Sequence, residues 1–301
     1  MPCSLPKRQT AALSSDTMRI LLIGAKGMLG STIVTDWTSE DLVAADAAEA
    51  DIRDIDQIRA LVSQARPDWI VLTAAYTDVD GSENNPQLAF AVNGAGAGNV
   101  ARIASEFRAR LLFVSTDYVF DGNSTRPYEP DDAPSPLNVY GASKKAGEAA
   151  VQSFARHWCI VRTSWLFGSA GSCFPEKILR ASESAPELTV VSDQVGSPTF
   201  SRDLAAAILR LLHLDVQGIV HTTNSGVCSW YEFAKEILRQ ARRDSVPLRP
   251  VTSSQYPRPA RRPSYSVLSP TSLNRYGIVM RPWQDALADY FNDLRQAGKL
   301  T

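Results

Sequence analysis

The stretch RILLIGAKGMLGSTIVTDW, residues 19–37, decides the fold. Its first six residues form an apolar run that ends in glycine, as in a strand buried on both faces, and a helical pattern follows from Met28. Gly24, Gly27 and Gly30 stand at the junction. Glycines allow a tight turn and a close approach to a pyrophosphate at a helix N-terminus. We therefore expect the first strand, turn and helix of a dinucleotide-binding domain.

The alternation of strand-like and helix-like segments continues along the first half of the chain. Apolar runs at 42–46, 69–75, 109–116 and 159–165 alternate with helical patterns at 54–65, at 86–107 and up to about 154. Asp54 and Pro86 suit the starts of two of these helices. Because this alternation is typical of βαβ units, we predict an α/β fold, a doubly wound parallel Rossmann sheet, over residues 18–168.

The pattern becomes irregular after residue 170. Helical segments are expected near 174–184, 201–213, 230–242 and 283–296, with strands at 188–192 and 218–223. Open parallel sheets bind ligands beyond the carboxyl ends of their strands. We therefore interpret residues 169–301 as a smaller C-terminal α/β portion that binds mainly substrate, with some segments returning to the Rossmann sheet. Residues 1–17 are expected to form a disordered tail.

Composition and charge exclude several classes of protein. The 301 residues are 44% hydrophobic, carry a net charge of -1 and contain no long basic run, which argues against binding of nucleic acid. No apolar run reaches membrane-spanning length, and no secretory signal is present, so we expect a cytoplasmic protein. The four cysteines and three histidines show no ligand spacing, so we predict free thiols and no metal.

Asp46 lies at the end of the second apolar run, about twenty residues after the glycine turn. A carboxylate there would accept a hydrogen bond from the ribose hydroxyls of the cofactor and would repel a 2′-phosphate, which favours NAD. Lys26 and Arg53 lie in loops that reach the same end and would tolerate a phosphate. We therefore predict NADPH or NADH as the cofactor. The alternative interpretation of Asp46 is a solvated turn residue that does not contact the cofactor.

The stretch NVYGASKKAGE holds a candidate catalytic pair, Tyr140 and Lys144. Residues four apart share one helix face, and this helix follows a proline-rich loop after the fourth strand. A neighbouring ammonium would favour the phenolate and lower the pKa of the tyrosine. Thr116, at the end of that strand, would hydrogen-bond the substrate oxygen. We predict all three as catalytic residues beside the nicotinamide.

Five motifs, GAKGMLG, STDYVFDG, SPLNVYGASKKAGE, VRTSWLFG and DQVGSPTFSRDLA, together resemble the extended short-chain dehydrogenase/reductases. Within these the chain is most similar to the dTDP-4-dehydrorhamnose reductase family, from Met18 to roughly Trp283. The resemblance implies an oxidoreductase that transfers a hydride from NADPH or NADH to the C4 ketone of dTDP-4-dehydro-L-rhamnose. It further implies a role in dTDP-rhamnose, and hence polysaccharide, biosynthesis. Tyr140 would then donate a proton, with Lys144 and Thr116 supporting it.

The resemblance also implies contact residues. Gly27, Met28 and Leu29 match the pyrophosphate loop, Asp46 the ribose contact, Asp51 and Ile52 the adenine contacts, and Ala74, Ala75 and Tyr76 the segment along the nicotinamide half. Thr116, Asp117 and Trp165 match contacts to the sugar nucleotide. Arg258, Arg261 and Arg262 lie where the family holds the diphosphate, and the sequence does not distinguish among them.

Three positions refine or question this resemblance. Tyr118 stands where related 4,6-dehydratases carry Glu, which favours simple reduction and makes Tyr118 a wall of the sugar pocket or a packing residue. Cys173 replaces an Asn of many relatives, so the polar contact made there is in doubt. Thr32 stands where an acidic residue would hold a divalent cation between subunits, which supports the prediction that no metal is required.

Two other functions stay open on the sequence. One is a reductase or epimerase of another nucleotide-4-keto sugar. The other is a non-catalytic NADP-binding module that resembles the regulatory subunit of methionine adenosyltransferase. The expected partner is a nucleotide-sugar substrate, and the expected assembly is a monomer or a homodimer.

Overall fold

The computed structural model describes residues 17–300, so the expected tail lies, except for Thr17, outside the described residues. Its centre is a six-stranded sheet in the order β10-β5-β4-β3-β1-β2, in which every neighbouring pair is parallel. The strands are β1 (Arg19–Ile23), β2 (Asp41–Ala45), β3 (Trp69–Leu72), β4 (Arg110–Thr116), β5 (Trp158–Thr163) and β10 (Gly218–His221). The predicted α/β class and doubly wound parallel sheet are confirmed.

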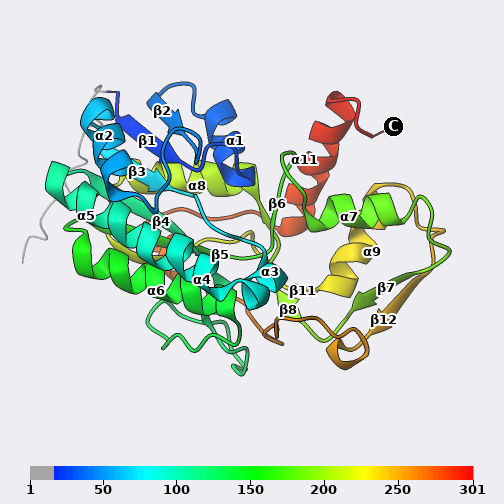
Figure 1. Cartoon of the computed structure of the whole chain (residues 1–301). Helices are drawn as coiled ribbons and strands as arrows, with labels where there is room; N and C mark the ends of the chain where they lie inside the picture. The colour runs from blue at the N-terminus through cyan, green and yellow to red at the C-terminus, as the bar shows by residue number, and fades with distance from the viewer. Residues whose placement is uncertain (1–16, 301) are drawn as a thin grey trace, which may run out of the picture.

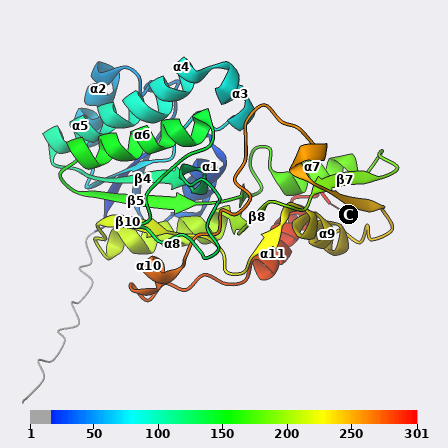
Figure 2. The same cartoon turned by 90° about the horizontal axis from the view of Figure 1, so that it is seen from below.

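Helices cover both faces of this sheet (Figures 1 and 2). One face carries α2 (Ile55–Ala65), α5 (Ala97–Phe107) and α6 (Val139–Phe154), and the other carries α1 (Met28–Asp36) and α8 (Ser201–His213). Successive strand residues point to opposite faces. Thus Ile20 and Leu22 pack with α1 and α8, whereas Leu21 and Ile23 pack with α2 and α5. The uninterrupted apolar run of the first strand follows from this burial on both sides.

The helix expected over residues 86–107 is interrupted by a wider turn. It consists of α4 (Pro86–Ala89), a π-helical stretch (Phe90–Gly96) and α5. Asn93 lies buried in that stretch, where its side chain accepts from the Tyr76 amide at 2.8 Å and donates to the Tyr76 carbonyl at 3.0 Å and to the Ser143 hydroxyl at 2.9 Å. π-turns inside helices often occur at functional sites. Here the turn ties the segment after β3 to α6.

The other elements form a second, smaller core beside the sheet (Figure 1). Its helices are α7 (Phe174–Ala181), α9 (Trp230–Gln240) and α11 (Trp283–Gln296), and its short strand pairs are β12 (Leu248–Val251) with β7 (Leu188–Val191), β11 (Cys228–Ser229) with β8 (Val195–Gly196), and β6 (Leu166–Phe167) with β9 (Thr199–Phe200). Phe167, Phe200, Phe233 and Phe291 fill it. By contrast, α8, β10 and the short α10 (Thr271–Asn274) belong to the sheet side. None of the helices within residues 17–300 has the length and apolar character needed to cross a membrane.

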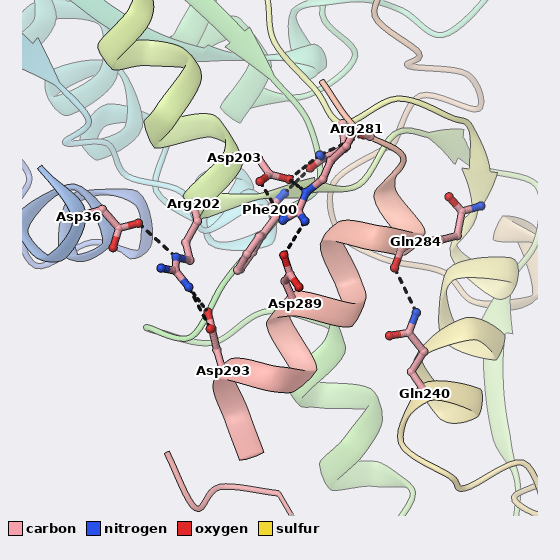
Figure 3. A network of polar contacts seen from close by, with 10 residues as sticks. Asp36, Phe200, Arg202, Asp203, Gln240, Arg281, Gln284, Asp289 and Asp293 are labelled. Carbon is pink, nitrogen blue, oxygen red and sulfur yellow. Dashed lines mark hydrogen bonds and ion pairs between the residues drawn. The ribbon is translucent and has the colours of Figure 1, made fainter. Parts of the chain in front are cut away.

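Charged side chains join the two cores at the start of α8 (Figure 3). Arg202 donates to Asp36 of α1 at 3.2 Å and to Asp293 of α11 at 2.9 Å. The next residue, Asp203, accepts two hydrogen bonds of 2.9 Å from Arg281. The helix that begins at the glycine turn is thereby held to the last helix of the second core.

A buried ion pair supports the helix that carries Tyr140 and Lys144. Arg162 of β5 donates to both carboxylate oxygens of Glu148 at 2.9 and 2.7 Å, and both residues are at most 3% exposed. Glu148 also accepts from the Ser115 hydroxyl at 2.6 Å, and Arg162 donates to the Pro130 carbonyl at 3.2 Å. The pair thus links α6, two central strands and the proline-rich loop.

We expect Glu148→Gln to lower the free energy of unfolding by about 3–5 kcal/mol, because the Arg162 charge would stay buried without its counter-charge. Denaturant unfolding followed by tryptophan fluorescence measures this. Glu106→Gln is the matched control, since Glu106 pairs with Arg59 at 3.3 Å on the surface and such pairs contribute less than about 1 kcal/mol. Equal losses in the two variants would contradict the prediction.

Candidate active site

A cavity of about 620 Å³ opens at the carboxyl ends of β1, β3, β4 and β5. Most of the residues singled out in the sequence line it: Gly24, Gly27, Met28, Leu29, Gly30, Asp46, Asp51, Ile52, Ala74, Ala75, Thr116, Asp117, Tyr140, Lys144 and Trp165. Tyr76 and Tyr118 lie outside the lining. The tertiary structure thus brings together residues that are up to 141 positions apart, whose individual roles stay predictions.

The glycine turn leaves backbone where a side chain would otherwise stand. Gly24 has a φ of +100°, and a Cβ there would lie 2.5 Å from the Ala74 amide nitrogen. A Cβ at Gly30 would lie 2.0 Å from the Gly24 carbonyl oxygen. No side chain caps the N-terminus of α1, whose N-cap residue is Gly27. The first amide N–H groups of α1 therefore face a cradle that suits a pyrophosphate.

Asp46 lies at the other end of this cradle. Its carboxylate accepts from the amides of Lys26 and Ala47, each at 2.8 Å, which fixes it against the glycine turn. Arg53 also lines the cavity, but it forms a forked contact with Asp51 and thereby lowers the pKa of that carboxyl. Of the two basic residues considered for a 2′-phosphate, the exposed Lys26 is thus the less constrained, with Glu49 3.9 Å from its Nζ.

Tyr140 and Lys144 lie on successive turns at the start of α6. Asn138 begins this helix, its side-chain oxygen accepting from the Gly141 amide at 2.7 Å. Lys144 is only 2% exposed, donates to the Val114 carbonyl at 2.7 Å and lies 4.0 Å above the Phe113 ring. Thr116, at the end of β4, donates to Asp117 at 3.1 Å. Tyr140 and Lys144 of α6 and Thr116 at the end of β4 all line the cavity.

Burial dominates the protonation of these groups. It raises the pKa of Tyr140 to about 12, although a hydrogen bond with Thr116 opposes the rise, and it lowers the pKa of Lys144 to about 7 against the pull of Glu148. The expectation that the ammonium lowers the pKa of Tyr140 is therefore wrong for the protein without cofactor. Desolvation of the phenolate is the largest cause of the rise. Tyr140 consequently keeps its proton at neutral pH.

Asp117 is a buried acidic group next to Thr116 at the cavity. It is 2% exposed, and one of its carboxylate oxygens has no hydrogen-bond partner among the described residues. Burial raises the pKa of Asp117 to about 7, with hydrogen bonds from Ser266 and Thr116 opposing the rise. An unpartnered buried oxygen at a cavity is suited to a ligand hydroxyl.

Trp165 has an unusual backbone. Its φ of +47° lies in the left-handed region, which is costly for a bulky side chain, and its ring stacks on Trp230 at 3.6 Å and 8°. A Cβ at Gly196 would lie 2.6 Å from the Trp165 ring, so that position has no room for a side chain. Trp230 and Asn93 were missed in the sequence, because neither belongs to a recognisable local pattern.

Among residues 17–300, no cysteine or histidine lines the cavity. Cys159, Cys173 and Cys228 are buried free thiols, and Cys3 lies outside the described residues. Cys173 contacts the Gly168 carbonyl and the Tyr290 hydroxyl, both at 3.7 Å, so it packs in the second core. Within residues 17–300 no three metal-binding side chains gather in one place.

A Rossmann sheet, a glycine cradle and a Tyr-Lys-Thr set at one cavity define an extended short-chain dehydrogenase/reductase. A family model described as the RmlD substrate binding domain matches residues 18–296. The chain belongs to this family.

Named relatives agree with this placement. A dTDP-4-dehydrorhamnose reductase of Mycobacterium tuberculosis is 40% identical, over 90% of this chain and 91% of the relative. A dTDP-4-keto-6-deoxy-D-glucose reductase of Streptomyces niveus is 38% identical, over 91% and 97%. The crystal structure of a dTDP-4-dehydrorhamnose reductase of Bacillus anthracis in complex with NADP has a TM-score of 0.90 and 37% identity, and covers 92% of this chain and 100% of that one.

Proposed function

We propose that the protein reduces the C4 ketone of dTDP-4-dehydro-L-rhamnose to dTDP-L-rhamnose with NADPH or NADH. The observation that carries this proposal is the convergence of Thr116, Tyr140 and Lys144 on one cavity with the glycine cradle. The names of the Mycobacterium tuberculosis relative and of the Bacillus anthracis structure supply the substrate and one of the cofactors.

The residues of the cradle would hold the cofactor, which supplies the hydride when it is bound. Gly24, Gly27 and Gly30 leave room for the pyrophosphate, and the α1 N-terminus favours its negative charge. Asp46 would bind the adenosine ribose, and Asp51 with Ile52 would line the adenine. Ala74, Ala75 and the segment up to Tyr76, which Asn93 anchors, would lie along the nicotinamide half.

Tyr140 would donate its proton to the C4 oxygen of the substrate as the hydride arrives at the carbon. Its raised pKa keeps this proton available at neutral pH. Lys144, fixed on the Val114 carbonyl, would hold the nicotinamide ribose and stabilise the resulting phenolate. Thr116 would hydrogen-bond the same substrate oxygen and keep the ketone in line.

The substrate would lie between the sheet and the second core. We assign residues 18–168 mainly to the cofactor and residues 169–300 mainly to the nucleotide sugar, with α8 and β10 returning to the sheet. Trp165, braced by Trp230, presents a rigid aromatic face for a sugar or a base, and the free oxygen of Asp117 suits a sugar hydroxyl. We further propose that the reaction takes place in the cytoplasm. The predicted assembly of the protein is a monomer or a homodimer.

We expect Asp46→Ser to raise the ratio of kcat/KM for NADPH to that for NADH by about tenfold, because the carboxylate repels a 2′-phosphate while Lys26 remains beside it. Steady-state rates with the two cofactors measure the ratio. Asp41→Asn is the control, since it removes a surface carboxylate that pairs with Arg19 outside the cavity lining and should change the ratio less than about twofold. An unchanged ratio in Asp46→Ser would remove Asp46 from cofactor selection.

The proposed reaction is tested by following oxidation of NADPH and NADH with dTDP-4-dehydro-L-rhamnose. The substrate is made in the same vessel by an upstream dehydratase and a 3,5-epimerase. We expect turnover only when the epimerase is present. No oxidation despite cofactor binding would refute this reaction and favour either another nucleotide-4-keto sugar as substrate or the non-catalytic module.

A second substrate stays open because the Streptomyces niveus relative, named for reduction of dTDP-4-keto-6-deoxy-D-glucose, is nearly as similar as the rhamnose enzyme. Turnover without the epimerase would favour this substrate. The same assay therefore separates the two reductases, which differ in the stereochemistry of the sugar that they accept.

A further inference from the structure

The arginine-rich segment YPRPARRPSY, residues 256–265, lies against the sheet side of the molecule although it follows the second core. Its three arginines differ in their contacts. Arg261 is exposed, and its side chain forms no ion pair within residues 17–300. Arg258 and Arg262 both bind Asp80 of the short helix α3 (Val79–Asn84), at 2.7 and 2.8 Å. This distinction, which the sequence left open, separates one free arginine from two that are held.

Arg262 is held more firmly than Arg258. Its side chain is 17% exposed, against 48% for Arg258. It donates to both Asp80 oxygens at 2.8 and 3.0 Å and to the Ala260 carbonyl at 2.7 Å. A forked contact fixes the plane of a guanidinium, and so fixes the direction of its remaining N–H groups. The guanidinium also lies close enough to the Tyr118 hydroxyl to oppose the rise that burial causes in the pKa of Tyr118.

Tyr118 lies directly against the start of α6. Its ring meets the Tyr140 ring edge to face, with centroids 6.0 Å apart and planes at 77°. Its backbone is equally close, since a Cβ at Gly141 would lie 2.0 Å from the Tyr118 carbonyl oxygen. Tyr118 is not part of the cavity lining. Its contacts therefore place it behind the candidate proton donor rather than against the ligand.

Helix α3 reaches α6 by a second contact. Glu83, one turn after Asp80, accepts from the Val139 amide at 2.8 Å, next to Tyr140. The same short helix thus fixes the backbone of the first turn of α6 and, through Arg262 and Tyr118, the ring that projects from it.

We propose that Arg262, anchored by Asp80, is a positioning residue for the proton donor: it fixes Tyr118, and the Tyr118 ring fixes the Tyr140 ring. This inference rests on the proposed function of Tyr140. Proton transfer requires the hydroxyl within hydrogen-bond reach of the reacting oxygen, and small displacements at such a site have large effects on rate. A contact between aromatic edges and faces restrains the ring without touching the substrate.

The test is a double-mutant cycle of Arg262→Gln and Tyr118→Phe. We expect Arg262→Gln to lower kcat about tenfold, with KM for the nucleotide sugar and for NADPH changed less than about twofold. Tyr118→Phe keeps the ring but removes the hydroxyl that Arg262 holds, so the double variant should lose no more than Arg262→Gln alone. Arg275→Gln, at an exposed arginine outside the cavity lining, is the control and should retain the wild-type kcat.

Two kinetic results would overturn the inference. Losses that multiply in the double variant would mean that Arg262 acts independently of Tyr118. A raised KM for the nucleotide sugar with an unchanged kcat would mean that Arg262 binds the substrate anion directly. Should Arg262→Gln not fold, Asp80→Asn takes its place in the cycle, with an expected loss of about threefold because Arg262 keeps its other partners.

A readout apart from activity separates this inference from the proposed function. A crystal structure of Arg262→Gln should show the Tyr118 and Tyr140 rings displaced or in more than one conformation. Unmoved rings would refute the positioning role whatever the substrate is. An inactive wild-type protein would instead refute the proposed function and leave this structural test in force.

Discussion

Tyr140→Phe should lower kcat by about 10²–10⁴-fold while the Kd for NADPH changes less than about twofold. The variant loses only the hydroxyl, so the transition state loses its proton donor. The ring keeps its packing against Tyr118, and the glycine cradle keeps its shape. Single-turnover rates and cofactor titration by fluorescence measure the two quantities separately.

The control for this variant is Tyr276→Phe. Tyr276 is 38% exposed and lies outside the cavity lining, so the same chemical change there should leave kcat unaltered. If Tyr140→Phe kept near-normal turnover, another group would have to supply the proton. Asp117, whose pKa is raised to about 7 by burial, would then be the next candidate to test.

Lys144→Met should lower kcat by about 10²-fold and weaken cofactor binding by about tenfold. Methionine fills the space of the buried stem beside Phe113, so the fold is retained. The ammonium, with its contact to the Val114 carbonyl, is lost. Without that charge the phenolate left by proton transfer and the nicotinamide ribose both lose a partner. Joint loss in kcat and in affinity distinguishes Lys144 from Tyr140.

The same variant gives a test by pH. Burial lowers the pKa of Lys144 from 10.5 to about 7, so between these values the unfolded chain binds a proton that the folded chain has released. The contribution of Lys144 to the free energy of unfolding should therefore rise as the pH rises from about 7 towards 10. Lys144→Met should lack this rise, which denaturant unfolding at several pH values would detect. Parallel curves for the two proteins would contradict the assigned burial of the ammonium.

Local patterns in the sequence determined the sheet and the place of the cavity. The apolar run before Gly24 predicts β1 because a strand buried on both faces tolerates few polar residues. The spacing of Tyr140 and Lys144 predicts their common helix face because four residues make about one turn. Both inferences depend on neighbours in the chain. The family resemblance then extended them to the other lining residues.

Long-range packing decided what the sequence left open or predicted wrongly. The pKa of Tyr140 rises mainly because elements distant in the chain remove water from it. Arg53 is engaged by Asp51, and Arg262 is oriented by Asp80, which lies 182 positions away. Residue types and spacing thus specified which chemical groups reach the cavity. Desolvation and hydrogen-bond partners, which exist only in the folded chain, set the direction and the protonation of those groups.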